Sequence, residues 1–147
     1  MKKLILILLI TTNIFALSPF SLEGINRVNI KVIDKSKLIP KSHLDSMKNT
    51  IELELKNVDI KTNSEIFSNL IIKVQGSKTA NNYTFHISMF IVEESSPIRD
   101  KKQENMSITY YKDDFFNTTE DALIVDTKES MIEYLLSDFI EQYKEEN

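Results

Sequence analysis

The chain of 147 residues contains no cysteine, no tryptophan, and only two glycines and two histidines. Without cysteine it has no disulfide, no thiol nucleophile and no thiolate ligand for a metal. The two glycines, Gly24 and Gly76, are too few for a loop whose backbone cradles phosphate. Thiol chemistry and a glycine-rich nucleotide loop are therefore excluded.

The two histidines are the remaining candidates for a general base at neutral pH. His43 lies beside Ser42 near a predicted helix start, and we interpret it as a solvated residue of the first turn. His86 lies on the longest predicted strand, with Ser88 on the same face. No Gly-x-Ser-x-Gly elbow surrounds Ser88, so we predict no catalytic residue and no enzyme. A hydrolase using His86 and Ser88 remains the second alternative function.

A stretch rich in side-chain oxygen is the other candidate for chemistry. It consists of Asp113, Asp114, Asn117, Glu120 and Asp121. Calcium takes such ligands, but the spacing and the glycine of an EF-hand are absent. We therefore predict a solvated acidic loop over residues 113–121, no metal site and no cofactor.

The charge balance disfavours two classes of partner. The formal net charge is −4, and it becomes −6 once Lys2 and Lys3 are removed with the predicted signal. An acidic domain lacks the clustered Lys and Arg that nucleic acid and anionic membranes require. The short basic stretch with Arg99, Lys101 and Lys102 is interpreted as a solvated hairpin tip.

The amino terminus has the layout of a secretory signal. Lys2 and Lys3 precede an uninterrupted apolar run, residues 4–10, and Ala16 is small enough to precede a cleavage site. The run is too short to span a bilayer. We predict a signal peptide over residues 1–16, a single domain over residues 17–147, and export to the periplasm without stable membrane insertion.

The pattern of apolar residues predicts five strands and two helices. A period of two indicates strands over 28–32, 58–62, 70–74, 83–92 and 106–111. Turn residues predict loops over 76–82 and 95–103. Helical spacing indicates a helix from a Ser42 cap to Asn57, and a last helix capped by Asp126. The apolar face of that last helix is predicted as Met131, Ile132, Leu135, Phe139 and Tyr143. Residues 144–147 are expected to be frayed.

This order of elements predicts an α+β fold. Both helices have one apolar stripe, so both should cover the same face of one mixed sheet of about five strands. The result is a two-layer sandwich of the form β-α-β-β-β-β-α.

The carboxyl-terminal part of the chain carries a resemblance. Ser107-Ile108-Thr109-Tyr110 is followed by an amphipathic helix that closes with Phe139-Ile140-Glu141-Gln142-Tyr143 and Asn147. These residues resemble the corresponding segments of small exported bacterial proteins of unknown function. The layout is similar to envelope accessory proteins such as the lipopolysaccharide-assembly lipoprotein and the amino-terminal domain of the TolB translocation protein. No cysteine is present for a lipid anchor, and the resemblance implies no catalytic residue.

The outer face of the predicted sheet is the candidate site. Alternation places eight residues on the face away from the helices: Ile71, Lys73, His86, Ser88, Phe90, Val92, Thr109 and Tyr111. Ile71, His86, Phe90, Val92 and Tyr111 form the candidate interaction face, because apolar groups rimmed by polar ones mark interaction surfaces. Alternatively, loops or the leader from Leu17 to Leu22 cover these residues.

The leading hypothesis for function is a non-enzymatic periplasmic accessory module of the cell envelope. It would dock a partner protein through the outer sheet face or a sheet edge. The alternative is a protein that binds a small apolar or lipid ligand between helices and sheet. The oligomeric state is left open.

Overall fold

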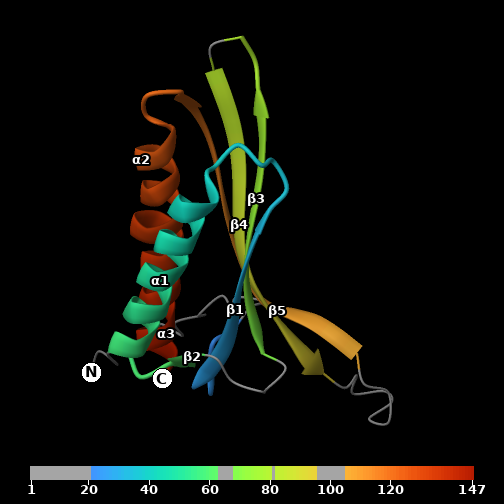
Figure 1. Cartoon of the computed structure of the whole chain (residues 1–147). Coiled ribbons are helices and arrows are strands. Elements are labelled where there is room, and N and C mark those ends of the chain that lie inside the picture. The colour runs from blue at the N-terminus through green and yellow to red at the C-terminus, as the bar shows by residue number, and fades with distance from the viewer. Residues whose placement is uncertain (1–20, 63–67, 81, 96–104) are drawn as a thin grey trace, which may run out of the picture.

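The computed structural model describes residues 21–62, 68–80, 82–95 and 105–147. They form one open five-stranded sheet covered on one face by helices (Figure 1). The predicted signal peptide and the predicted hairpin tip with Arg99, Lys101 and Lys102 lie outside the described residues. The predicted sandwich, with its order β-α-β-β-β-β-α, is confirmed.

The sheet is mixed, with strand order β2-β1-β3-β4-β5. β1 pairs in parallel with β2 and β3, whereas β3, β4 and β5 pair antiparallel. The strands are β1 (Arg27–Asp34), β2 (Lys61–Thr62), β3 (Asn69–Lys78), β4 (Asn82–Ser95) and β5 (Asn105–Thr119). The helices are α1 (Lys41–Asn57), α2 (Leu123–Lys128), the π-helical segment η1 (Glu129–Leu136) and α3 (Ser137–Glu146).

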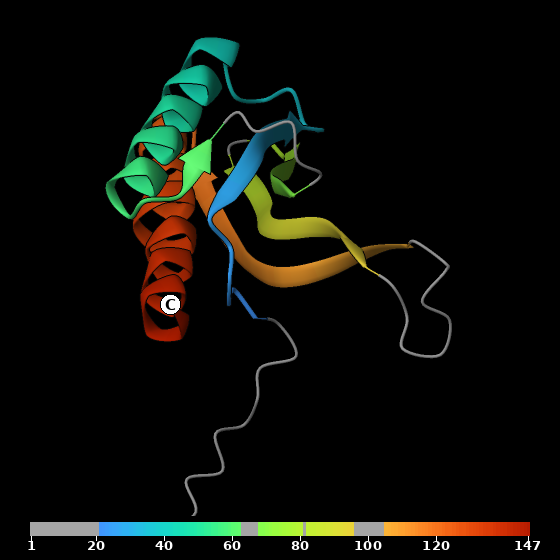
Figure 2. The ribbon, with the colours of Figure 1, turned by 90° about the horizontal axis from the view of Figure 1, so that it is seen from below.

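The core lies between the helices and one face of the sheet (Figure 2). β4 contributes alternate residues from Tyr83 to Ile91, none more than 6% exposed. α1 contributes Met47, Ile51 and Leu55 at helical spacing, which confirms that it continues as a helix past Thr50. From the last helix the buried residues include Met131, Leu135 and Phe139, as its apolar stripe predicts.

The predicted helix caps are wrong in both helices. α1 begins at Lys41 after Pro40, and the Ser42 side chain makes no capping hydrogen bond. The Pro40 carbonyl instead accepts hydrogen bonds from the N–H groups of His43 and Leu44, so backbone groups close the first turn. The last helix begins at Leu123, and Asp126 lies inside it, accepting a hydrogen bond from the Thr118 hydroxyl at 2.5 Å. Asp126 thus ties the helix to β5.

The predicted loop over 76–82 is largely strand. β3 continues to Lys78 and β4 begins at Asn82, so Gly76 lies within the ladder, opposite Phe85. An added Cβ at Gly76 would lie 2.6 Å from the Phe85 ring. Glycine is therefore required at this position because an aromatic ring lies over the backbone, not because the chain turns.

The predicted acidic loop over 113–121 is also wrong. β5 is 15 residues long and runs to Thr119, so Asp113 and Asp114 are successive strand residues on opposite faces. Phe115 and Phe116 likewise separate, and only Phe116 packs against the core. Polar groups pair across the ladder here, with the Thr84 hydroxyl donating to Asn117 at 2.7 Å. The prediction of strands depended on apolar residues at every second position, and this part of β5 has polar pairs instead.

The last residues are not frayed, because they hold the first described ones. Glu146 accepts hydrogen bonds from the Ser21 hydroxyl at 2.9 Å and from the Leu22 N–H. The Asn147 side chain donates to the Leu22 carbonyl and accepts from the Gly24 N–H. Leu22 is fully buried in the core. The two ends of the described chain are thus joined.

We predict that Gly76→Ala lowers the free energy of unfolding by about 1–3 kcal/mol, because the new methyl group displaces the Phe85 ring in a packed core. Urea denaturation measures the change, with the exposed neighbour substitution Ser77→Ala as a control. In a Phe85→Leu background, the cost of Gly76→Ala should fall, since the ring is absent. An equal cost in both backgrounds would contradict the proposed contact.

The carboxylate of Glu146 predicts a pH dependence. Burial opposes its ionisation, but hydrogen bonds from Gln142, Leu22 and Ser21 outweigh burial and lower its pKa. A lowered pKa stabilises the folded state above the unfolded pKa, and this stability is lost as the pH falls through the folded value. Glu146→Gln should cost about 1–2 kcal/mol at pH 7 and less near pH 3.

Denaturation at the two pH values tests this expectation, with Glu145→Gln as the matched control on the exposed neighbour. Equal stability of Glu146→Gln and the unaltered protein at pH 7 would contradict the contact between the chain ends.

Candidate interaction face

The antiparallel register aligns the predicted apolar residues in one row across the sheet. Ile71 of β3 lies opposite Phe90 of β4, and Phe90 lies opposite Tyr111 of β5. The Phe90 and Tyr111 rings are stacked with centroids 6.3 Å apart. On β1, Lys31 lies opposite Ile71 and extends the row. The row therefore runs across four strands.

Neighbouring rows of the same face hold further exposed apolar side chains. Phe115 lies opposite His86 and is 68% exposed, the highest value among the large exposed hydrophobic residues. Ile33 of β1 is 36% exposed and lies opposite Lys73. The sequence analysis missed Phe115 because it assigned residues 113–121 to a loop. Residues 111–118 show no period-two alternation of apolar and polar side chains, so the pattern that identified the other strands could not identify this one.

The polar part of the face is centred on His86. Its Nε2 lies 2.8 Å from the Asp113 carboxylate, and its ring lies 6.1 Å from that of Phe115. Asp113 also affects Tyr111: burial raises the pKa of the Tyr111 hydroxyl, and the nearby Asp113 carboxylate raises it further. A histidine, a carboxylate and two aromatic rings therefore lie together on this face.

A β-bulge changes the lower end of the face. The register shifts between Ile91 and Val92, so Val92 lies opposite Ile108. The Thr109 hydroxyl donates to Glu93 at 2.7 Å, and the Thr109 carbonyl accepts from the Ser21 N–H. The sequence analysis placed Thr109 on the same face as Tyr111. In the structure Thr109 lies at the bulge and has no Cα partner in the β4–β5 register.

The helices lie on the opposite side of the sheet from this row (Figures 1 and 2). Ile71, Phe90 and Val92 are half-buried, and Tyr111 is 37% exposed. Leu22, the last residue of the predicted leader, is buried in the core with the helices instead of lying across the row. Among the described residues, no helix covers the row.

The proposed hydrolase pair lacks a direct contact. His86 Nε2 is bound to Asp113, and no hydrogen bond within the described part of the chain joins Ser88 to His86. Ser88 is only 4% exposed. A nucleophilic serine must reach both its base and the substrate, and this hydroxyl does neither in this arrangement.

The centre of the space between the helices and the sheet is filled by side chains. Tyr110 meets Phe139 edge-on with ring centroids 5.1 Å apart. Ile87, Met89 and Leu135 are fully buried in the same cluster. The described residues of this interface resemble a packed core more than the lining of a ligand cavity.

The carboxylates predicted to form an acidic loop do not converge. Asp113 and Asp114 point to opposite faces because they are neighbours in β5. In the described ranges, no group of three or more His, Cys, Asp or Glu is arranged to hold a metal ion.

Comparisons with known proteins assign no family. No family model matches the chain, and no curated protein matches it. Among the helices in the described ranges, none is long and apolar enough to cross a membrane.

Proposed function

We propose that this protein is an exported, non-enzymatic accessory module of the cell envelope that docks a partner protein. The docking surface is the outer face of the sheet, defined by Ile71, His86, Phe90, Val92 and Tyr111, to which we add Phe115. The secretory layout of the amino terminus supports the location. The in-register row from Ile71 to Tyr111 supports the docking surface and is the observation that carries the proposal.

The aromatic residues of this face suit a protein interface. The aromatic side chains of Phe90, Tyr111 and Phe115 have large apolar surfaces but few rotatable bonds. Little conformational entropy is therefore lost when a partner fixes them. Their polar neighbours, His86 and Asp113, already contact each other at 2.8 Å, so a partner that covers them leaves neither side chain without a polar partner. Apolar centres with polar rims are typical of protein interfaces.

The resemblance to envelope accessory proteins is consistent with this proposal. It concerns the order of elements and the residues of the last strand and helix. Binding of a lipid or another small apolar ligand is less well supported, because the described core is filled by its own side chains. A hydrolase is less well supported because Ser88 and His86 are not in contact.

We predict that replacing Phe90 and Tyr111 by Lys abolishes partner capture in the native envelope while the domain stays folded. Charged side chains in the centre of the row cannot be buried against an apolar partner. Photo-crosslinking from a probe at Phe115 measures capture, and circular dichroism verifies the fold. The matched control places the probe at Val125 of α2, which is 65% exposed on the helical side.

A discrete protein adduct from Phe115 that is absent from Val125, and is lost in the double variant, would support docking. Adducts of equal yield from both positions, or capture that survives the double substitution, would contradict it.

A further inference from the structure

The edge of the sheet at β1 carries a second feature. β2 pairs only with Arg27 and Val28, so β1 from Asn29 to Asp34 has no strand neighbour on that edge among the described residues. The Asn29 N–H donates to Ser68 and the Lys35 N–H donates to Val74, both toward β3. Because backbone groups alternate along a strand, those of Ile30 and Val32 point to the open edge.

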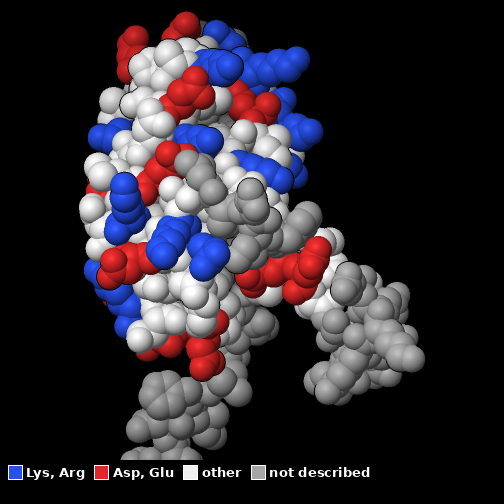
Figure 3. Space-filling model, turned by 60° about the horizontal axis from the view of Figure 1, so that its bottom comes forward, with Lys and Arg blue, Asp and Glu red and all other residues white. Residues whose placement is uncertain are grey.

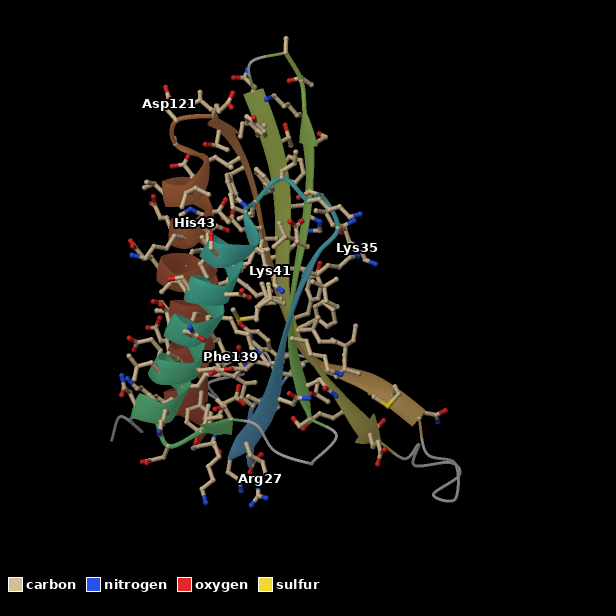
Figure 4. The ribbon with its side chains drawn as sticks, in the orientation of Figure 1. Arg27, Lys35, Lys41, His43, Asp121 and Phe139 are labelled. Atoms are coloured by element: carbon tan, nitrogen blue, oxygen red, sulfur yellow. The ribbon has the colours of Figure 1, made fainter. Side chains whose placement is uncertain are left out.

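A groove of about 470 Å³ follows this edge between β1 and α1. Its floor is apolar, with Ile30, Val32 and Leu44. Its charged groups are mostly basic: Lys31 from β1, Lys41 and Lys48 from α1, and one carboxylate, Asp45. Lys41 lies between the first turn of α1 and β1 in the view of Figure 4.

Two of these lysines are available to a ligand. Lys48 lies 3.6 Å from Glu52, whereas neither Lys31 nor Lys41 forms an ion pair within the part of the chain described. Lys35, just beyond β1, is exposed but does not line the groove. Figure 3 shows several Lys and Arg side chains, with some Asp and Glu side chains among them, at the upper right of that view.

This basic edge contrasts with the other end of the sheet. Residues 21–62, which form β1, α1 and β2, hold 8 Lys and Arg against 6 Asp and Glu. Residues 105–147, which form β5 and the last helix, hold 3 Lys against 11 Asp and Glu. An acidic ligand is therefore attracted to the β1 edge and repelled from the β5 side, which favours one docking position.

We infer that the β1–α1 groove binds an extended acidic segment of a partner protein by strand addition. Backbone groups of the segment pair with those of Ile30 and Val32. Lys31 and Ile33 lie on the outer side of β1, whereas Lys41 and Leu44 lie on the helical side, so the segment carries acidic and apolar side chains on both of its faces. On the outer face they meet Lys31 and Ile33, and on the helical face they meet Lys41 and Leu44. The open edge accommodates about six residues of such a segment. This inference rests on the proposed docking function and adds the edge used and the chemistry of the partner.

The probe is a fluorescein-labelled synthetic peptide of about seven residues that repeats Glu-Glu-Val-Val, which places both residue types on each face of the strand. Fluorescence anisotropy with the purified domain should show saturable binding that weakens as salt rises from about 0.05 to about 0.5 M. Lys31→Glu and Lys41→Glu should each raise Kd about tenfold or more. Lys128→Glu, on α2 and remote from the groove, is the matched control and should change Kd little.

Two altered peptides test the binding mode. Methylation of alternate backbone nitrogens removes the donors that pair with β1 and should abolish binding, while a peptide that repeats Lys-Lys-Val-Val should not bind. Absence of binding by the acidic peptide, or binding that survives backbone methylation, would overturn the inference. So would binding that is unaffected by Lys31→Glu and Lys41→Glu but lost in the Phe90→Lys, Tyr111→Lys double variant.

Different results would reject the outer-face proposal and the groove proposal. The double variant on the outer face should keep peptide binding, and Lys41→Glu, which lies on the helical side of the sheet, should keep the Phe115 adduct. Loss of the Phe115 adduct with peptide binding intact leaves the groove as a docking site. The reverse pattern rejects only the groove.

Discussion

The alternation of side chains along β4 gives the sheet one face that is buried under the helices and one face that is not. Tyr83, Phe85, Ile87, Met89 and Ile91 point into the core, and each meets side chains from the helices or neighbouring strands. The intervening residues, His86 and Phe90 among them, must then face the other way. Because α1 and the last helix both lie on the first side, the second side receives no helix. The candidate interaction face follows from this one-sided packing.

Two further contacts preserve that arrangement. Gly76 allows the Phe85 ring to lie over β3, which keeps the upper part of the sheet packed. Glu146 and Asn147 bind residues 21–24, which holds the start of the domain against the end of the last helix. The lower end of the sheet is thereby joined to the helical layer. The open face stays opposite both contacts, so a partner could dock on it without disturbing either one.

Much of the fold could be predicted from the sequence, and the errors share physical causes. The alternation of apolar and polar residues predicted β1, β3 and β4. The helical spacing of Met47, Ile51 and Leu55 predicted α1. Gly76 was misread as a turn because the close approach of Phe85 depends on the pairing register of β3 with β4. Asp113 and Asp114 were misread as a loop because their partners, His86 among them, are supplied by β4. Cross-strand pairing of this kind leaves no trace in local composition.

The candidate interaction face could likewise be predicted only in part. Ile71, Phe90 and Tyr111 could be predicted, because alternation within each strand placed them on one side, although their alignment in one row depends on the register. Phe115 could not be found once its segment had been assigned to a loop. The open edge of β1 could not be predicted either, since it depends on how few residues of β2 pair with it. The function remains a proposal that rests on these surfaces.

The central claim is that the outer face is open in the isolated protein and covered by a partner in the envelope. Hydroxyl-radical footprinting of both states, read by mass spectrometry, tests it most directly. The account predicts that Phe115 is strongly modified in the purified domain and protected in the native envelope, while buried Phe139 is protected in both. Protection of Phe115 in the purified domain, or equal modification in both states, would contradict the claim.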